Sequence, residues 1–303
     1  MSFLGVFGHV NIDYIMKVAK LPAPNTCIQV SDVKRLFGGT GANIAILASK
    51  MGVKTSLASF VGKDFPVDFK KLFTSAGVDI TDLKEIKGEP TPTCRLLTDS
   101  EGSQIGIMDQ GPMGHMQDFE LARHTVRNSQ VIHVGTGRPE YYKGIMQLAR
   151  DMKKRIHFDP AQEIHYVYNA ASFRELLKFA DVLFVNKSEL ATALRYLKKK
   201  NNTALLDCVD TLVLTLGKDG SQILRHREKI DIPAIEPRKI KDPTGAGDAY
   251  RAGFYAGMSR KMDLEMCGLL GASAASFILE VEGPLGKLPT FKEVLARASM
   301  AKN

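Results

Sequence analysis

The sequence alternates short, apolar, strand-like runs with longer amphipathic segments. Four such runs occupy residues 131–134, 155–158, 182–185 and 211–216. Apolar runs of this length suit strands that are buried on both faces, and the segments between them suit helices that cover those faces. Because parallel strands need a crossover connection that is usually helical, the alternation predicts an α/β fold with a mostly parallel central sheet.

Two regions depart from this alternation. Residues 10–36 and 91–109 are poor in helical pattern, and the second reads as two strands, 93–98 and 103–108, around a turn at 99–102. At 303 residues the chain has the size of one large α/β domain or of two small ones. We find no internal repeat, low-complexity segment or Pro/Gly-rich linker, so the two regions read as insertions rather than as a tethered domain.

Residues 241–254 place a turn of small residues, an acidic side chain and a helix start close together. Gly245 and Gly247 permit backbone angles and close approaches that a Cβ atom would block. A helix is predicted from Ala249 onward, so the amides of Gly245, Ala246 and Gly247 would point outward from its positive end. A turn of this kind is suited to hold an anion, in particular a phosphate.

Asp248 follows this turn and stands where the phosphate would sit. A carboxylate repels bound phosphate, but it suits a group that takes a proton from a hydroxyl attacking that phosphate. For an isolated Gly-x-Gly-Asp string, an ordinary N-cap would be the better explanation. No Walker-type phosphate loop is present, and Gly39-Thr40-Gly41 lacks the third glycine of a dinucleotide fingerprint.

Four motifs follow one another along the chain. They are residues 37–45 (FGGTGANIA), 186–189 (NKSE), 214–220 (LTLGKDG) and 241–254 (KDPTGAGDAYRAGF). On these motifs the sequence is identified as a member of the ribokinase (PfkB) family of sugar and nucleoside kinases. The resemblance implies a single ribokinase-like domain over residues 1–303, with a three-layer α/β/α architecture. It also implies a small β-sheet lid, formed by the insertions at 10–36 and 91–109, that covers the acceptor.

The resemblance implies roles for individual residues. Asp248 is the expected catalytic base, and the amides of Gly245, Ala246 and Gly247 are the expected anion hole. The residues expected to bind the acceptor are Asp13, Gln29, Gly38, Gly39, Asn43, Gln162 and Asp248. An ionised carboxylate such as Asp13 can accept hydrogen bonds from two neighbouring hydroxyls, and the amides of Gln29 and Gln162 suit the edge of a base.

The same resemblance places ATP and its metal ion. The residues expected to bind ATP are Asn186, Thr215, Gly217, Lys218, Gly220 and Gly283. Mg²⁺ keeps several of its waters, so Glu189 is expected to reach it through water, although in isolation Glu189 reads as an acid that stabilises a helix start. Many family members have Gly-Ala where this chain reads Glu282-Gly283-Pro284, so the requirement for a monovalent cation is left open.

The acceptor is the least constrained part of the prediction. Residues 21–30 and 158–163 resemble archaeal nucleoside kinases of broad specificity within the family. This likeness predicts ATP-dependent transfer of the γ-phosphoryl group to the 5′-hydroxyl of a nucleoside. A simple sugar or a sugar acid is the alternative acceptor, and the presence of Asp248 argues against a catalytically inactive protein on this fold. We also expect a homodimer formed through the lid.

The charge and the cysteine content limit which other partners and bonds are expected. The net charge is +8, with basic clusters at 153–155 and 198–200. Both clusters end helix-like stretches and lack interleaved aromatic residues, so solvated helix ends explain them better than nucleic-acid binding. No apolar run reaches transmembrane length and no secretory pattern is seen, which predicts a cytoplasmic protein without a membrane partner. The four widely separated cysteines are expected to be buried free thiols.

Overall fold

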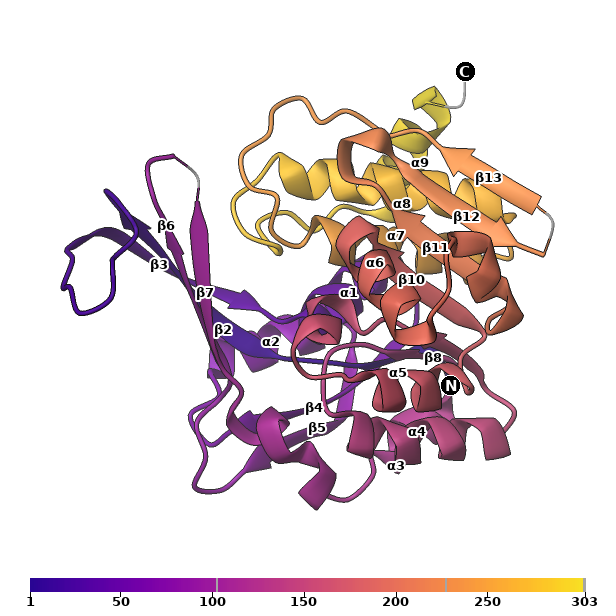
Figure 1. Cartoon of the computed structure of the whole chain (residues 1–303), viewed down its shortest axis with the longest axis horizontal. Helices are drawn as coiled ribbons and strands as arrows, with labels where there is room; N and C mark the ends of the chain where they lie inside the picture. The colour runs from indigo at the N-terminus through magenta and orange to yellow at the C-terminus, as the bar shows by residue number, and fades with distance from the viewer. Residues whose placement is uncertain (102, 227, 302–303) are drawn as a thin grey trace.

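The computed structural model describes residues 1–101, 103–226 and 228–301 and is built around a nine-stranded sheet (Figure 1). The strand order is β13-β12-β11-β10-β9-β8-β1-β4-β5, with the strands from β11 to β5 parallel and β12 and β13 added antiparallel at one edge. The strands are β1 (Ser2–Phe7), β4 (Thr55–Gly62), β5 (Asp79–Ile86), β8 (Ser129–Val134), β9 (Arg155–Phe158), β10 (Val182–Asn186), β11 (Thr211–Thr215), β12 (Ser221–Arg225) and β13 (Glu228–Ile232). The predicted mostly parallel α/β fold is therefore confirmed.

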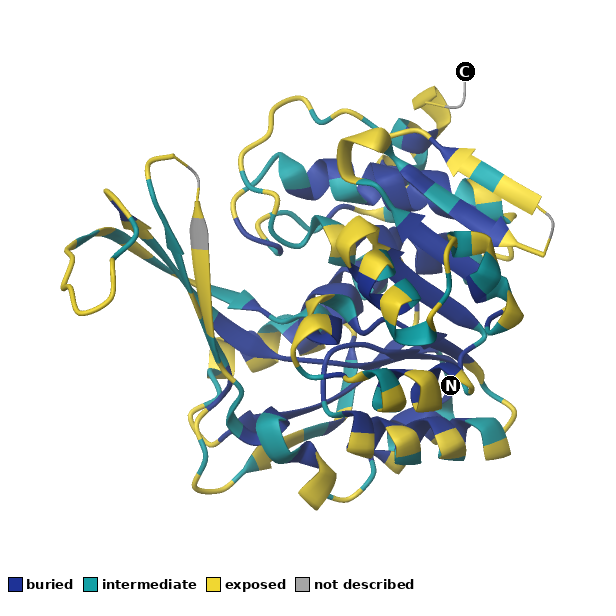
Figure 2. Cartoon of the chain, in the orientation of Figure 1, coloured by how far each residue is buried: buried dark blue, intermediate teal, exposed yellow. Residues whose placement is uncertain are grey.

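Helices cover both faces of this sheet, which leaves its central strands buried (Figure 2). One hydrophobic core joins the sheet to α1 (Thr40–Lys50), α2 (Val67–Ala76), α7 (Ala246–Met258), α8 (Leu264–Leu279) and α9 (Phe291–Ala301). A second core joins the other face to α3 (Arg123–Asn128), α4 (Pro139–Asp151), α5 (Ala170–Leu177) and α6 (Lys187–Leu197). Short 3₁₀ segments lie at Gly111–Asp118, Ala161–His165, Asn202–Asp207 and Gly217–Asp219. These layers explain the continuous apolar runs, because the apolar side chains of the central strands pack into one or the other of the two cores.

A second, four-stranded sheet projects from this body at the left of Figure 1. It consists of β2 (Asn11–Val18), β3 (Val30–Gly38), β6 (Thr93–Thr98) and β7 (Gln104–Asp109), in the order β3-β2-β6-β7. The segments 10–36 and 91–109, which we expected to form a lid, contain most of these strands. The second predicted strand begins one residue later than expected, at Gln104, and Gly102 of the predicted turn lies outside the described residues.

The base of the lid is fixed to the body by aromatic packing and by two glycines. Phe37, at the end of β3, stacks on Phe69 of α2 with the ring centroids 4.4 Å apart. A Cβ atom at Gly38 would lie 2.0 Å from Oδ2 of Asp13, and one at Gly39 would lie 2.3 Å from the carbonyl oxygen of His9. Gly39 also has a φ of +100° as it caps α1, so only glycine lets the chain pass this close beneath Asp13.

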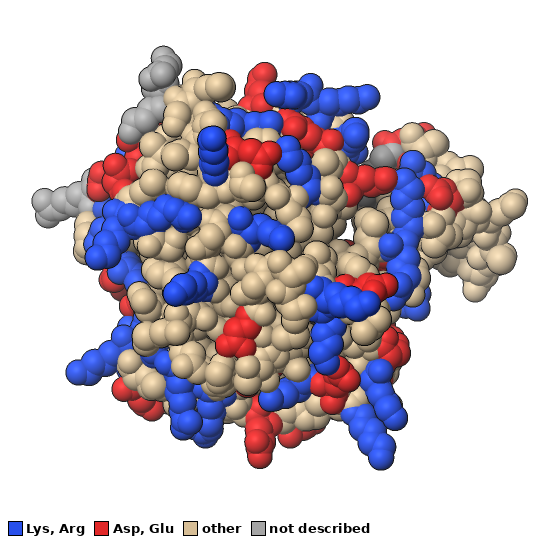
Figure 3. Space-filling model, turned by 180° about the vertical axis from the view of Figure 1, so that it is seen from behind, with Lys and Arg blue, Asp and Glu red and all other residues tan. Residues whose placement is uncertain are grey.

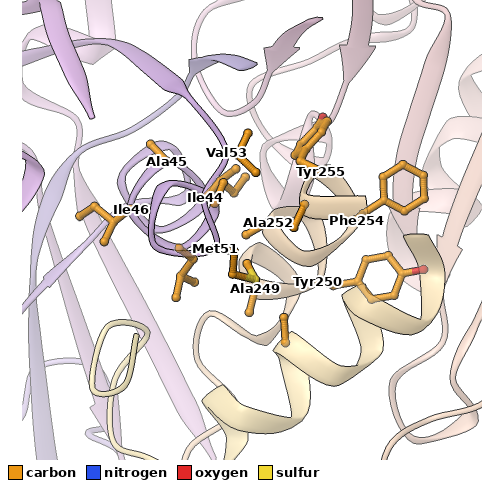
Figure 4. Close-up of a cluster of buried hydrophobic side chains, with 14 of the residues drawn as sticks. Ile44, Ala45, Ile46, Met51, Val53, Ala249, Tyr250, Ala252, Phe254 and Tyr255 are labelled. Atoms are coloured by element: carbon orange, nitrogen blue, oxygen red, sulfur yellow. The ribbon is translucent and has the colours of Figure 1, made fainter. Parts of the chain in front are cut away.

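Helices α1 and α7 lie side by side in the first core. Figure 4 shows Ile44 and Met51 next to Ala249 and Ala252 in this buried cluster. The small alanine side chains of α7 let the two helices approach closely. The N-terminal ends of α1 and α7, which carry the first and last of the four motifs, are thereby held in one place.

The two basic clusters lie at helix ends, as expected. Lys153 follows the end of α4, and Lys198 caps the end of α6. On the face shown in Figure 3, lysine and arginine side chains are interspersed with acidic ones rather than gathered in one patch. Among the described residues, no helix is long and apolar enough to cross a membrane.

The prediction for the cysteines was mostly wrong. All four are free thiols, but only Cys267 is buried. Cys94 and Cys208 are half-buried, and Cys27 is exposed because it lies in the loop between β2 and β3. Composition gave no sign of these differences, since burial depends on where each segment meets the rest of the fold.

Candidate active site

The small-residue turn forms the N-terminal end of α7. The helix begins at Ala246, three residues earlier than predicted, and Gly245 caps it with a φ of +80°. A Cβ atom at Gly245 would lie 2.4 Å from Cβ of Pro284, so the turn also needs glycine to fit against the C-terminal loop. The Ala246 amide donates to the carbonyl of Pro243 at 3.2 Å, whereas none of the hydrogen bonds found among the described residues uses the amides of Gly245 or Gly247. Two of the three predicted anion-hole donors are therefore available.

Asp242 locks this turn to the C-terminal loop. Its Oδ1 accepts a hydrogen bond from the Thr244 amide at 2.8 Å, and its Oδ2 accepts one from the Gly283 amide at 2.9 Å. Above the same loop, Leu36 of the lid packs so closely that a Cβ atom at Gly283 would lie 2.7 Å from its Cδ1. The turn, the loop predicted to contact ATP and the lid therefore meet at one place.

Asp248 lies in the first turn of α7 and is held by α1. Asn43, which is 4% exposed, donates from Nδ2 to Oδ2 of Asp248 at 2.7 Å. Burial raises the pKa of Asp248 from 3.8 to about 7, against the opposing effects of the Asn43 hydrogen bond and the Arg251 charge. A carboxylate with this pKa is a much better base near neutral pH than an exposed aspartate. Asn43 and Asp248, each predicted to bind the acceptor, are thus in direct contact.

Asp13 lies above the same place on the lid strand β2. Its Oδ1 accepts a hydrogen bond from Nδ2 of Asn11 at 2.5 Å, and its carboxylate stands directly over Gly38. Burial raises the pKa of Asp13 to about 6; the Asn11 hydrogen bond lowers it and the Asp242 charge raises it. The negative charge of Asp13 also raises the pKa of Asp248, so the two carboxylates act on each other.

The amide oxygen of Asn43 is buried, and among the residues that the structure describes it has no hydrogen-bond partner. A buried acceptor without a partner costs free energy unless a ligand or water supplies the donor. Since Nδ2 of the same side chain already binds Asp248, the free oxygen marks a position beside the predicted base where a hydroxyl group of a substrate can donate.

Other predicted acceptor residues are not part of this arrangement. Gln29 and Gln162 are both exposed, and no contact found among the described residues joins either to Asp13 or Asp248. Their base-reading roles remain predictions. A buried polar network that sequence reasoning missed lies nearby instead: His9 bonds to Thr136 and Gln110, and Gln110 donates to Glu163 at 3.2 Å. Both ring nitrogens of His9 are therefore engaged in hydrogen bonds.

On the predicted ATP side, Asn186 and Glu189 form a reciprocal cap at the start of α6. Asn186 donates to Glu189 from its backbone at 2.7 Å and from its side chain at 2.8 Å. Thr215 ends β11, and the loop with Gly217, Lys218 and Gly220 follows it. Lys187 joins this loop to α6 through an ion pair with Asp219 at 2.7 Å. Within the described part of the chain, no cluster of three acidic, histidine or cysteine side chains is arranged to hold a metal ion.

Comparison with known proteins identifies the fold and the chemistry. The profile of the pfkB family carbohydrate kinases matches residues 1–290. The chain belongs to this family. It is 35% identical to a nucleoside kinase of Methanocaldococcus jannaschii over 98% of this chain and 97% of that protein, and 35% identical to one of Methanothermobacter thermautotrophicus over 96% and 93%.

Solved structures agree with this family assignment. The M. jannaschii nucleoside kinase, described as an archaeal member of the ribokinase family, superposes with a TM-score of 0.91 at 34% identity and covers 99% of each chain. A Burkholderia thailandensis nucleoside kinase in complex with inosine has a TM-score of 0.90 at 21% identity over 98% of each chain, and it supports the fold alone. The protein is thus an ATP-dependent kinase with a ribokinase-like fold that phosphorylates an alcohol group.

Proposed function

We propose that this kinase transfers the γ-phosphoryl group of ATP to the 5′-hydroxyl of a nucleoside. The observation that carries the proposal is the position of Asp248, which is bonded to Asn43 and lies beside the two available amides of Gly245 and Gly247. A hydroxyl held by Asp248 faces donors that can stabilise negative charge on the transferred group. With its raised pKa, Asp248 can accept the hydroxyl proton late in a loose transition state.

The phosphate donor belongs on the other side of the same turn. We assign its base and ribose to Thr215, Gly217, Lys218, Gly220 and Gly283, and its phosphates to the α7 turn and Asn186. When bound, Mg²⁺ neutralises charge on these phosphates. The buried Glu189 carboxylate, which accepts hydrogen bonds only from Asn186 among the described residues, keeps further lone pairs that can hold waters of the metal.

A ribose diol fits the acceptor side. Asp13 offers a carboxylate with one oxygen engaged by Asn11, and Asn43 offers its free amide oxygen. Gly38 and Gly39 have no side chain beside Asp13 and Asn11, so an acceptor can approach their backbone. Two relatives at 35% identity are nucleoside kinases. A simple sugar or sugar acid is the second candidate, because a Haemophilus influenzae ribokinase also matches 96% of the chain, at 22% identity.

An acceptor panel tests this proposal. ATP consumption should be measured with adenosine, inosine, guanosine, cytidine and uridine, and with ribose, fructose and sugar acids at equal concentration. We expect at least one ribonucleoside to exceed every sugar by about tenfold or more in kcat/KM, since the site must fill both the diol and base positions. A panel in which ribose or fructose is the best acceptor would move the assignment to a sugar kinase.

The raised pKa of Asp248 predicts a steep pH dependence. Because the base must be ionised, kcat/KM should be highest above about pH 8 and fall as the pH drops through the pKa of about 7. Protonation of Asp13, with a pKa of about 6, should steepen the fall at lower pH. The residual activity of Asp248→Asn serves as the control, since it should lack the limb near pH 7. An unchanged limb in that variant would assign the titration to the substrate.

The lid supports a homodimer as part of the proposal. Strand register places Met16, Val33, Leu97, Ile105 and Ile107 on the lid face opposite Asp13, and Val33 and Ile107 are 56% and 55% exposed. The same register places Arg35 and Arg95 on this face beside Tyr14. A sheet face that combines exposed apolar side chains with arginines is a typical subunit contact. A cytoplasmic location, where ATP is supplied, belongs to the same proposal.

Light scattering can test the dimer. Val33→Lys combined with Ile107→Lys should convert a dimer of the wild-type protein into a monomer, because burying two like charges beside Arg95, which lies opposite Ile107, is costly. Val67→Asp, at a site on α2 that is 63% exposed, is the matched control and should leave the mass unchanged. A wild-type mass of one chain would refute the dimer.

A further inference from the structure

A buried ion pair lies directly beneath the α7 turn. Arg251 and Asp159 are 6% and 3% exposed, and the guanidinium binds the carboxylate with two hydrogen bonds, Nε to Oδ2 at 2.7 Å and Nη2 to Oδ1 at 3.0 Å. Asp159 directly follows β9, whereas Arg251 is on α7. The pair therefore ties the second turn of α7 to the carboxyl edge of the central sheet.

The third arm of the guanidinium reaches the turn itself. Nη1 of Arg251 donates to the carbonyl oxygen of Gly247 at 3.2 Å, and a Cβ atom at Gly247 would lie 3.0 Å from the same nitrogen. The bare Gly247 thus provides space for Arg251 on the inner side of the turn. A side chain at position 247 would therefore displace the Arg251 guanidinium. From the sequence, we expected it to affect only the outer face of the turn, where the phosphate binds.

This arrangement is unfavourable as a purely structural device. A buried positive charge near the N-terminus of a helix opposes the helix dipole, and burying an ion pair seldom stabilises a fold more than apolar packing would. His133 lies 3.7 Å from Asp159, but burial lowers its pKa to about 4, so it is neutral near pH 7. The positive charge that pairs with Asp159 therefore comes from Arg251 and not from His133.

We propose that the Asp159–Arg251 pair is a positioning device for phosphoryl transfer, which holds the Gly247 peptide so that the turn presents its amides outward and sets the positive charge beside the Asp248 base. The inference rests on the proposed function. Arg251 and Asp159 are positioning residues, since they act through Gly247 and Asp248. Neither residue was assigned a role from the sequence.

The charges around Asp248 make the proposal specific. Asn43 of α1 and Arg251 of α7 lower its pKa, and Asp159, after β9, and Asp13 of β2 raise it. Removing Arg251 and removing Asp159 must therefore shift the titration of Asp248 in opposite directions. General damage to the fold would not shift the pKa of Asp248 in opposite directions in the two variants.

The test compares Arg251→Met, Asp159→Asn and Arg251→Lys by pH profiles of kcat/KM with the best acceptor of the panel. We expect the acid limb to move up by roughly one pH unit in Arg251→Met, and to move down in Asp159→Asn. Arg251→Lys keeps the positive charge but loses the two-pronged hydrogen bonding of the guanidinium. The acid limb of its pH profile should therefore stay in place, while kcat falls about tenfold or more. Arg150→Met is the control, because Arg150 pairs with Asp181 at 2.9 Å at the opposite end of the sheet strands.

Folding is followed by thermal unfolding of each variant. If Arg251→Met does not fold, the isosteric Asp159→Asn and the conservative Arg251→Lys still carry the test. Acid limbs that stay at the wild-type position in Arg251→Met and Asp159→Asn, or that move in the same direction, would overturn the inference. Failure of the proposed function is recognised separately: a sugar as the best acceptor of the panel would overturn the nucleoside assignment, and near-normal turnover of Asp248→Asn would overturn Asp248 as the base.

Discussion

Replacing Asp248 with asparagine should lower kcat by roughly 10²- to 10⁴-fold, the usual contribution of a general base. The substituted amide keeps an oxygen that can accept the hydrogen bond from Asn43, which measures 2.7 Å in the native protein, so the acceptor pocket keeps its shape. ATP binding should change little, because the Gly245 and Gly247 amides are unaffected. Turnover under saturating MgATP and nucleoside is the measurement, and near-normal kcat would refute Asp248 as the base.

The same variant should be more stable than the native protein at alkaline pH. The pKa of Asp248 is raised in the folded state from 3.8 to about 7, so the folded state binds more protons than the unfolded state between these values. The free energy of unfolding therefore falls as the pH rises through this window, by at most about 4 kcal/mol. Asp248→Asn should remove this loss, with a higher melting temperature at pH 8 and little difference near pH 4.

Asp231→Asn provides the matched control for both measurements. Asp231 is exposed on the edge strand β13 and pairs with Lys229 at 3.0 Å, so its replacement should change neither kcat nor the melting temperature appreciably. A variant that gains stability while losing turnover would show that the site keeps a carboxylate at a cost to the fold.

The fold was largely predictable because its signals are local. Residues 155–158 were expected to form a strand, and β9 has these bounds; residues 131–134 and 182–185 fall within β8 and β10. A strand buried on both faces needs an apolar run of a certain length, and that requirement can be read in one place along the chain. The start of α7 was misplaced because Gly247, a poor helix former, lies inside the first turn, where tertiary contacts hold it.

The site was predictable only where a motif is contiguous. Asp248 and Asn43 were expected to meet at the acceptor because each lies within its own motif, and their hydrogen bond joins residues 205 positions apart. The Asp159–Arg251 ion pair was not predicted, although both residues lie in segments on which the family resemblance rests. The signal was a charged residue within a mostly apolar helix stretch, but its partner is set by how β9 packs beside α7, which no local pattern encodes.

The lid carboxylate should decide whether the acceptor needs its diol. Oδ1 of Asp13 is engaged by Asn11, and burial raises the pKa of Asp13 to about 6, so the side chain is ionised at pH 8. A 2′- or 3′-deoxynucleoside would leave this partly buried charge short of a donor. An unpaired buried polar group costs about 1–3 kcal/mol, so the native kinase should prefer ribonucleosides by roughly tenfold to a hundredfold in kcat/KM.

Asp13→Ala should remove most of this preference, chiefly by lowering kcat/KM for ribonucleosides while that for deoxynucleosides changes little. Asp32→Ala is the matched control, since Asp32 lies opposite Lys17 near the far end of the same lid sheet and should leave the preference intact. Because the argument concerns the difference between two acceptors, a general loss of lid stability would lower both rates and leave their ratio unchanged. A preference that survives in Asp13→Ala would show that the diol is bound elsewhere, and the unpaired amide oxygen of Asn43 would then be the group to test.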